Sequence, residues 1–173
     1  EIIHSDVWST STPSLSGCRY YVIFIDDYTR FCWLFSLSNK SDVYSTFVKL
    51  KLLVEKQFNS TIKQFQSDNC GEYCSTIFMQ FLSAHGIFHR LSHPHTSQQN
   101  DLAERKHRHI VENGLTLLAK SSLPLKYWDE AFRTAVYLYN RLPNSVLQFK
   151  TPLEVLFHTQ PEFSQLKLFG CVC

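Results

Sequence analysis

Three carboxylate residues stand where they could act together on a phosphodiester. Asp6 lies in the strand-like run IIHSDVW (2–8), Asp68 follows the strand-like run TIKQFQ (61–66), and Glu104 stands near the start of an expected helix. Carboxylates that converge at the edge of a sheet can hold two divalent cations about 3.5–4 Å apart, an arrangement that drives in-line displacement at phosphorus. We therefore take the three as candidate catalytic residues and metal ligands. The alternative is a strand end, a turn cap and a solvated helix residue.

Polar and basic side chains flank Glu104 and could bind DNA. The loop before it offers hydroxyl and amide groups, and the helix that carries it offers cations, which could contact phosphates and make binding salt-dependent. The candidate DNA-binding residues are Ser97, Gln98, Gln99, Asn100, Arg105, Lys106 and Arg108. For Arg105 and Lys106 an ordinary solvated helix face is the alternative.

The elements that must position these residues follow an α/β order. Runs rich in aromatic and β-branched residues predict strands at 2–7, 20–26 and 31–37, joined as an antiparallel meander. Apolar residues at steps of three and four then predict a helix from 39 or 41 to 58. Because a helical crossover follows the third strand, we expect parallel pairing elsewhere in the sheet.

The second half of the chain adds two strands and several helices. The expected strands are 62–66 and 87–91, and 167–173 is either a short strand or a tail. The expected helices are 75–85, 101–120, 124–142 and 151–157. The predicted architecture is a five-stranded mixed sheet, with three antiparallel strands and then two strands joined by helical crossovers, flanked by helices.

Eight short motifs run through nearly the whole chain in order. They are HSDVW (4–8), YYVIFIDDYTRFCWLF (20–35), NKSDVY (39–44), QSDNCGEY (66–73), PHTSQQNDLAERKHRHIVENGLTLL (94–118), LPLKYWDEAF (123–132), YLYNRLP (137–143) and LFGC (168–171). Thirty-five residues separate Asp68 from Glu104. In these motifs and this spacing the chain resembles the catalytic core of a retroviral-type integrase, and specifically that of plant copia-type (Pseudoviridae) LTR retrotransposons.

The resemblance implies a fold, an activity and partners. The fold is the ribonuclease-H-like α/β fold, and the activity is DNA integration by 3′-end processing and strand transfer. The implied cofactors are two Mg²⁺ ions, with Mn²⁺ as an alternative, held by Asp6, Asp68 and Glu104. The implied partners are the DNA of the element ends and of the target, and further copies of the chain, without a small-molecule cofactor. Such a protein acts in the nucleus, is also present in a cytoplasmic particle as part of a polyprotein, and is not secreted.

Size and composition are consistent with one catalytic core. The 173 residues include 44% hydrophobic side chains, enough for the core of a single domain. We expect residues 1–173 to be an integrase core truncated at both ends, without the histidine–cysteine zinc module and the tail of a full integrase. The net charge of +2 is too low to indicate nucleic-acid binding by itself.

Two function classes are disfavoured by the sequence. No apolar run reaches the roughly 18 residues that a membrane span needs. The six cysteines do not complete a zinc-finger pattern, so free thiols are expected rather than a zinc site.

Two positions depart from the family's pattern beside the proposed chemistry. Cys70 and Asp101 stand where the family usually has glycine. Asp101 lies one turn before Glu104, where its charge could repel DNA phosphate, although it would also favour the N-terminus of a helix. We hypothesise a decayed copy with impaired strand transfer. A ribonuclease H and a nucleic-acid-binding remnant without activity remain alternatives.

Overall fold

The computed structural model describes residues 2–68, 71–91, 101–164 and 166–171. Its strands are β1 (Ile2–Ser9), β2 (Tyr20–Asp26), β3 (Cys32–Leu37), β4 (Gln64–Ser67) and β5 (Phe88–Leu91). Its α-helices are α1 (Asp42–Phe58), α2 (Thr76–Ala84), α3 (Asp101–Lys120), α4 (Trp128–Tyr139) and α5 (Pro152–Phe157). Two short 3-10 helices, η2 (Leu125–Tyr127) and η3 (Ser145–Leu147), precede α4 and α5.

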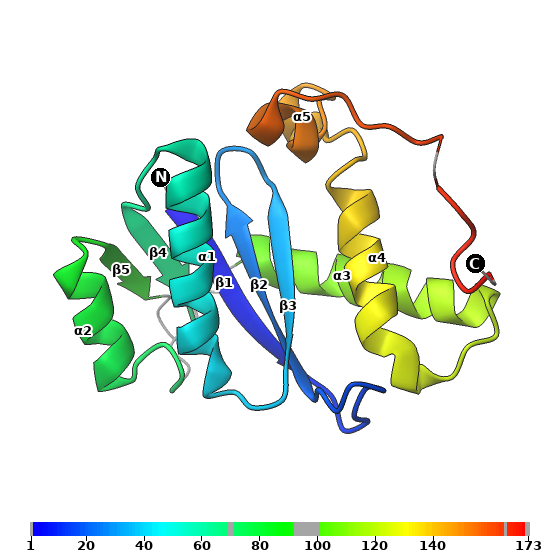
Figure 1. Cartoon of the computed structure of the whole chain (residues 1–173), viewed down its shortest axis with the longest axis horizontal. Coiled ribbons are helices and arrows are strands. Elements are labelled where there is room, and N and C mark those ends of the chain that lie inside the picture. Colours follow the sequence, from blue (N-terminus) through cyan, green and yellow to red (C-terminus); the bar gives the residue numbers. More distant parts are fainter. Residues whose placement is uncertain (1, 69–70, 92–100, 165, 172–173) are drawn as a thin grey trace.

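The five strands form one mixed sheet in the order β3-β2-β1-β4-β5. β2 pairs antiparallel with both β1 and β3, whereas β4 pairs parallel with both β1 and β5. The antiparallel meander and the two helical crossovers expected from the sequence are therefore confirmed. β1 lies in the centre, between the antiparallel and the parallel halves (Figure 1).

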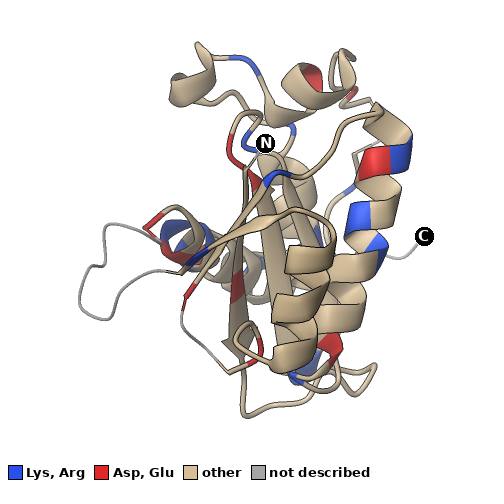
Figure 2. Cartoon of the chain, turned by 90° about the vertical axis from the view of Figure 1, so that its left-hand side faces the viewer, with Lys and Arg blue, Asp and Glu red and all other residues tan. Residues whose placement is uncertain are grey.

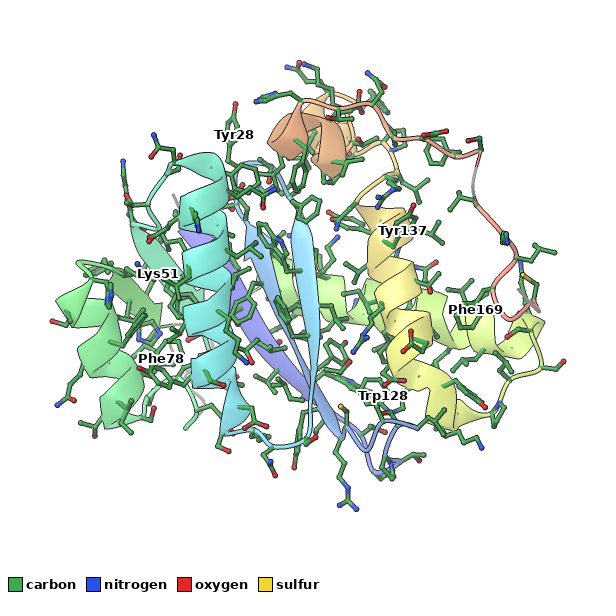
Figure 3. The ribbon with its side chains drawn as sticks, in the orientation of Figure 1. Tyr28, Lys51, Phe78, Trp128, Tyr137 and Phe169 are labelled. Atoms are coloured by element: carbon green, nitrogen blue, oxygen red, sulfur yellow. The ribbon has the colours of Figure 1, made fainter. Side chains whose placement is uncertain are left out.

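Helices cover both faces of the sheet, so the central strands are buried on both sides. One core contains Phe24 of β2 with side chains of α1 and α2, and the other contains Tyr21 of β2 with side chains of α3 and α4. In Figure 3, Phe78 lies between α1 and α2, whereas Trp128 lies between the sheet and α4. Strand alternation therefore assigns each residue of β1 and β2 to one of two layers.

The face of α1 follows its apolar spacing. Val43, Phe47 and Leu50 are buried, and Val54 and Phe58 are partly buried, as steps of four and three residues require. The helix ends at Asn59, which adopts a left-handed φ of 48°. Asparagine tolerates this conformation better than most residues, so it ends the helix without a glycine.

The predicted helix over 124–142 is shorter in the structure. Residues Leu125–Tyr127 form η2 and the α-helix runs from Trp128 to Tyr139. The next side chain, Asn140, leaves the helix pattern to bind β3: its Oδ1 accepts from Cys32 N at 2.9 Å and its Nδ2 donates to Cys32 O at 2.8 Å. This long-range pairing, which local spacing does not reveal, fixes the end of α4.

The C-terminal segment runs back along the outside of α4 towards the end of α3 (Figure 1). Within its described residues, 166–171, it forms a turn and no strand, so the tail alternative for this segment is the one observed. None of the helices in the described ranges is long and apolar enough to cross a membrane.

Candidate active site

Asp6 and Asp68 are brought together by the parallel pairing of β1 with β4. In this pair Ile2 stands opposite Gln64 and His4 stands opposite Gln66. Continued by two residues, the same register sets Asp6 opposite Asp68, which directly follows the end of β4. Because paired residues of adjacent strands point to the same face, both carboxylates belong to one side of the sheet.

That side is the one covered by α3. Ile3 and Val7 of β1 pack into the core of α1 and α2, whereas Trp8 packs into the core of α3 and α4. Asp6 alternates with Val7 and shares its face with Trp8, so it points towards α3. One of its oxygens, Oδ1, accepts a hydrogen bond from Val7 N at 2.8 Å.

Glu104 stands in the first turn of α3 with an exposed side chain. Its neighbour Ala103 is fully buried, so Glu104 lies at the edge of the buried face, as its spacing predicts. The next turn of the helix contacts Asp6 through His107: the distance from His107 Nε2 to Asp6 Oδ2 is 3.2 Å. The helical turn that carries Glu104 therefore lies at the same end of the sheet as Asp6.

The three carboxylates do not form a closed metal-binding group. Within 2–68, 71–91, 101–164 and 166–171, no three His, Cys, Asp or Glu side chains gather closely enough to hold a metal ion. Carboxylate oxygens are nevertheless the donors that Mg²⁺ prefers, and Mg²⁺ uses only one or two protein carboxylates beside waters and substrate phosphates. By donor chemistry, Asp6 and Asp68 on one face suit such an ion, with Glu104 nearby on α3.

His107 is held between Asp6 and a buried tyrosine. Its Nδ1 lies 2.8 Å from the hydroxyl of Tyr21 on β2, and the two rings are 5.1 Å apart. Tyr21 is fully buried, and burial raises the pKa of its phenol far above the ordinary value, so the hydroxyl stays protonated. Tyr21 therefore fixes the plane of the imidazole ring beside Asp6.

The strand ends that carry the two aspartates are held from the opposite face. Ser5 precedes Asp6, and its hydroxyl lies 2.6 Å from the hydroxyl of Tyr73. Ser67 precedes Asp68, and its hydroxyl lies 3.0 Å from Nε2 of His89 on β5. The two Ser-Asp pairs thus place a hydrogen-bonded anchor on one side of the sheet and a carboxylate on the other.

The predicted DNA-binding residues of α3 have different surroundings. Arg108 is exposed, and so is Arg105, which pairs with Asp101 at 3.0 Å. Lys106 is buried, with Nζ 3.0 Å from the centroid of the Tyr139 ring, and burial lowers its pKa to about 8. A buried ammonium is poorly placed for a phosphate, so this surrounding argues against the predicted contact of Lys106.

The remaining DNA-binding candidates, Ser97, Gln98, Gln99 and Asn100, lie outside the described residues. Among the described residues, basic and acidic side chains alternate over several elements (Figure 2), as the low net charge suggests. An electrostatic footprint for DNA would therefore be local to α3 rather than spread over a whole face.

Sequence reasoning did not assign a role to His107 or to Tyr21. A signal was present for His107, because it follows the buried position 103 by four residues and Glu104 by three, which sets it on the sheet-facing side one turn on. Tyr21 could not be found in this way, because its partner lies 86 residues away in the chain.

Comparison with known proteins supports an integrase at several levels. The sequence model described as "Integrase core domain" matches residues 1–97, more than half of the chain. The chain belongs to the integrase core family. Within this family, it is similar to the retrovirus-related Pol polyproteins of plant transposons. The integrase core is 50% identical to that of transposon RE1 and 51% identical to that of transposon RE2, both of Arabidopsis thaliana, over 173 residues.

A third relative, the Pol polyprotein of transposon TNT 1-94 of Nicotiana tabacum, is 40% identical over 172 residues. The matches cover 99–100% of the integrase core but only 12–13% of each polyprotein. The resemblance to copia-type plant elements is thus confirmed. The integrase core spans about an eighth of the length of these relatives.

The fold has a counterpart among solved structures. A chain of the simian T-cell lymphotropic virus intasome, determined by cryo-electron microscopy in complex with PP2A regulatory subunit B56 gamma, superposes with a TM-score of 0.71. The match covers 99% of the integrase core and 64% of the viral chain at 17% identity. At this identity the likeness concerns the fold alone, and it confirms the expected ribonuclease-H-like α/β fold.

Proposed function

We propose that this integrase core catalyses metal-dependent polynucleotidyl transfer. The reaction would process the 3′ ends of retrotransposon DNA and join them to target DNA. Asp6, Asp68 and Glu104 would hold two divalent cations, Mg²⁺ or Mn²⁺, and further copies of the chain would bring two DNA ends together. The membership of the integrase core family and the plant Pol relatives support this proposal.

One observation carries the assignment of the site. The parallel register of β1 and β4 aligns Asp6 with Asp68 on the face where α3 presents Glu104. Carboxylates from two adjacent parallel strands and one helix would approach a phosphodiester from one side. Bound there, two divalent cations would activate the attacking oxygen and stabilise the leaving oxygen.

The residues around the carboxylates have binding and positioning roles in this proposal. Arg108, exposed one turn after Glu104, would contact the DNA backbone. The Ser5–Tyr73 and Ser67–His89 hydrogen bonds would keep the strand ends in place while DNA enters. The polar residues 97–100 would position the DNA end beside Glu104.

The proposal is tested with a strand-transfer assay. The purified chain is incubated with Mg²⁺, a duplex that ends in the terminal sequence of the element, and a supercoiled plasmid as target. Joined product is expected for the unchanged chain, and Asp68→Asn or Glu104→Gln is expected to abolish it, because each removes an anionic ligand while keeping the side-chain shape. Glu112→Gln, an exposed change on the same helix, serves as the matched control and should retain activity.

The same preparations also separate the alternative functions. A ribonuclease H would cleave an RNA–DNA hybrid with Mg²⁺ and leave the duplex DNA intact. A decayed remnant would bind the duplex without nicking it. Joining or nicking that persists in Asp68→Asn would contradict the assignment of the metal site.

A further inference from the structure

We propose that His107 is a direct nitrogen ligand of the metal ion that Asp6 binds. This inference rests on the proposed metal site and adds a side chain that the Asp-Asp-Glu set lacks. It starts from a close approach between a carboxylate oxygen and a ring nitrogen, Asp6 Oδ2 and His107 Nε2, at 3.2 Å.

The nitrogen of His107 is buried and has an unused lone pair. The side chain is 10% exposed, and within the described part of the chain its Nε2 makes no hydrogen bond. Although Asp6 Oδ2 is close, the ring nitrogen is not directed along the line to it. A buried ring nitrogen without a hydrogen bond costs free energy unless another partner satisfies it.

A shared metal ion accounts for both the distance and the misalignment. Oxygen and imidazole nitrogen ligands lie about 2.0–2.1 Å from ions such as Mg²⁺ and Zn²⁺, so two neighbouring ligands of an octahedral ion are about 3.0 Å apart. Two groups that bind one ion point at the ion and not at each other. An ion pair between Asp6 and His107 would instead direct an N–H at the carboxylate.

Tyr21 prepares the ring for this role. In the tautomer that donates Nδ1–H to the Tyr21 hydroxyl, at 2.8 Å, the proton is on Nδ1 and Nε2 keeps its lone pair. Metal-binding histidines generally donate their second ring N–H to a fixed acceptor, which sets the tautomer and the ring plane. The buried Tyr21 has this position relative to His107.

A nitrogen ligand changes which ions the site prefers. Carboxylate and water oxygens suit Mg²⁺, whereas imidazole favours transition-metal ions. A site that contains Asp6 and His107 should therefore prefer Mn²⁺ over Mg²⁺ more strongly than a site made of carboxylates alone. Bound Mn²⁺ also gives a spectroscopic probe of its own ligands.

The test is pulsed electron paramagnetic resonance of Mn²⁺ bound to the full 173-residue chain. Direct coordination by His107 is expected to modulate the Mn²⁺ echo at ¹⁴N frequencies, and growth on ¹⁵N-histidine should shift these frequencies without any mutation. His107→Gln should remove the modulation and weaken Mn²⁺ binding by about tenfold or more, with a smaller effect on Mg²⁺. His109→Gln, two residues further on and exposed, is the matched control and should keep the signal.

The outcomes separate this inference from the proposed function. Mn²⁺ that is lost in Asp6→Asn but shows no ¹⁴N modulation in the unchanged chain would overturn the role of His107 and leave the carboxylate site intact. Modulation that persists in His107→Gln would also overturn it. Failure of the chain to bind Mn²⁺ at all would contradict both proposals together.

Discussion

Glu104, Lys106 and His107 are close in sequence, yet their side chains have three different surroundings. Glu104 is exposed, Lys106 lies under the ring of Tyr139, and His107 lies beside Asp6. Successive positions of a helix are rotated by about 100°, so neighbours in sequence reach different neighbours in space. Chemistry at this site therefore depends on each position separately and not on the charge of the segment.

At this scale we predict that Arg108 and Lys106 differ in DNA binding. Arg108→Ala should weaken binding of a DNA duplex and reduce the slope of log affinity against log salt by about one, because one phosphate contact is lost. Lys106→Met should change neither, because the buried ammonium does not reach solvent. Fluorescence anisotropy at several salt concentrations measures both. Equal effects of the two changes would contradict the different surroundings of the two cations.

The helix α3 connects the site to the rest of the molecule. Its buried face packs on the sheet and on α4, and Gly114 lies where the two helices are closest. A Cβ at this position would lie 2.2 Å from Cδ1 of Phe132, whose ring is buried among the aromatic residues of the core. Glycine is needed here for close approach and not for an unusual backbone conformation.

We predict that Gly114→Ala destabilises the fold by about 1–2 kcal/mol. Overpacking costs about 1–3 kcal/mol, whereas the better helix propensity of alanine returns at most about 1 kcal/mol. Urea unfolding followed by circular dichroism gives the free energy. In a Phe132→Leu background the additional cost of Gly114→Ala should shrink, because the smaller side chain leaves room. A stabilising effect of Gly114→Ala alone would refute the close packing.

The start of α3 decides the outcome of the departure at Asp101. In the structure this carboxylate accepts from the guanidinium of Arg105 at 3.0 Å in the first turn of the helix, where negative charge is favoured. The added charge is thus partly neutralised within the helix. The same pairing also engages one of the cations expected to contact DNA.

We predict that Asp101→Gly raises strand-transfer activity and costs less than about 1 kcal/mol of stability. It frees Arg105 and gives the residues before Glu104 more backbone freedom, while an exposed ion pair contributes only about 0–1 kcal/mol. The strand-transfer assay and thermal unfolding measure the two effects. Asp101→Asn removes the charge without the added freedom, so an equal gain in that variant would assign the effect to charge. Unchanged activity of the glycine variant would reject the loop explanation.

Across the whole molecule, partly buried histidines connect stability to pH. Burial lowers the pKa of His89, and it has the same first-ranking effect on His4 and His109. Below the ordinary pKa of about 6.5 the unfolded chain binds protons that the folded chain binds only at lower pH. The unfolded state then holds more protons, so stability rises with pH and falls on acidification.

We predict that the free energy of unfolding decreases between pH 7.5 and pH 5.5, and that His89→Gln makes this decrease smaller. The decrease should persist in part, because His4 and His109 remain. Urea unfolding at pH 7.5, 6.5 and 5.5 measures it, with His85→Gln, an exposed change on the same side of the sheet, as the control. A decrease of the same size in His89→Gln would show that burial of this ring does not control the response.

The sequence by itself determined the elements, their order and the place of the carboxylates on them. Periodicity located the strands and helices, with small shifts at their ends, and the spacing of Ala103, Ile110 and Gly114 predicted the buried face of α3. These properties depend on residues near one another in the chain, so local patterns are sufficient. The pairing of Asp6 and Asp68 needed one further step, the parallel register of β1 with β4.

Only the tertiary structure decided what each side chain faces. Asn140 ends α4 because Cys32 lies opposite, Lys106 is buried because Tyr139 covers it, and His107 lies between Tyr21 and Asp6. Helical spacing states which residues share a face, but the partner across that face comes from a distant segment. Burial and hydrogen bonding at the site therefore follow from packing between elements, which no local pattern contains.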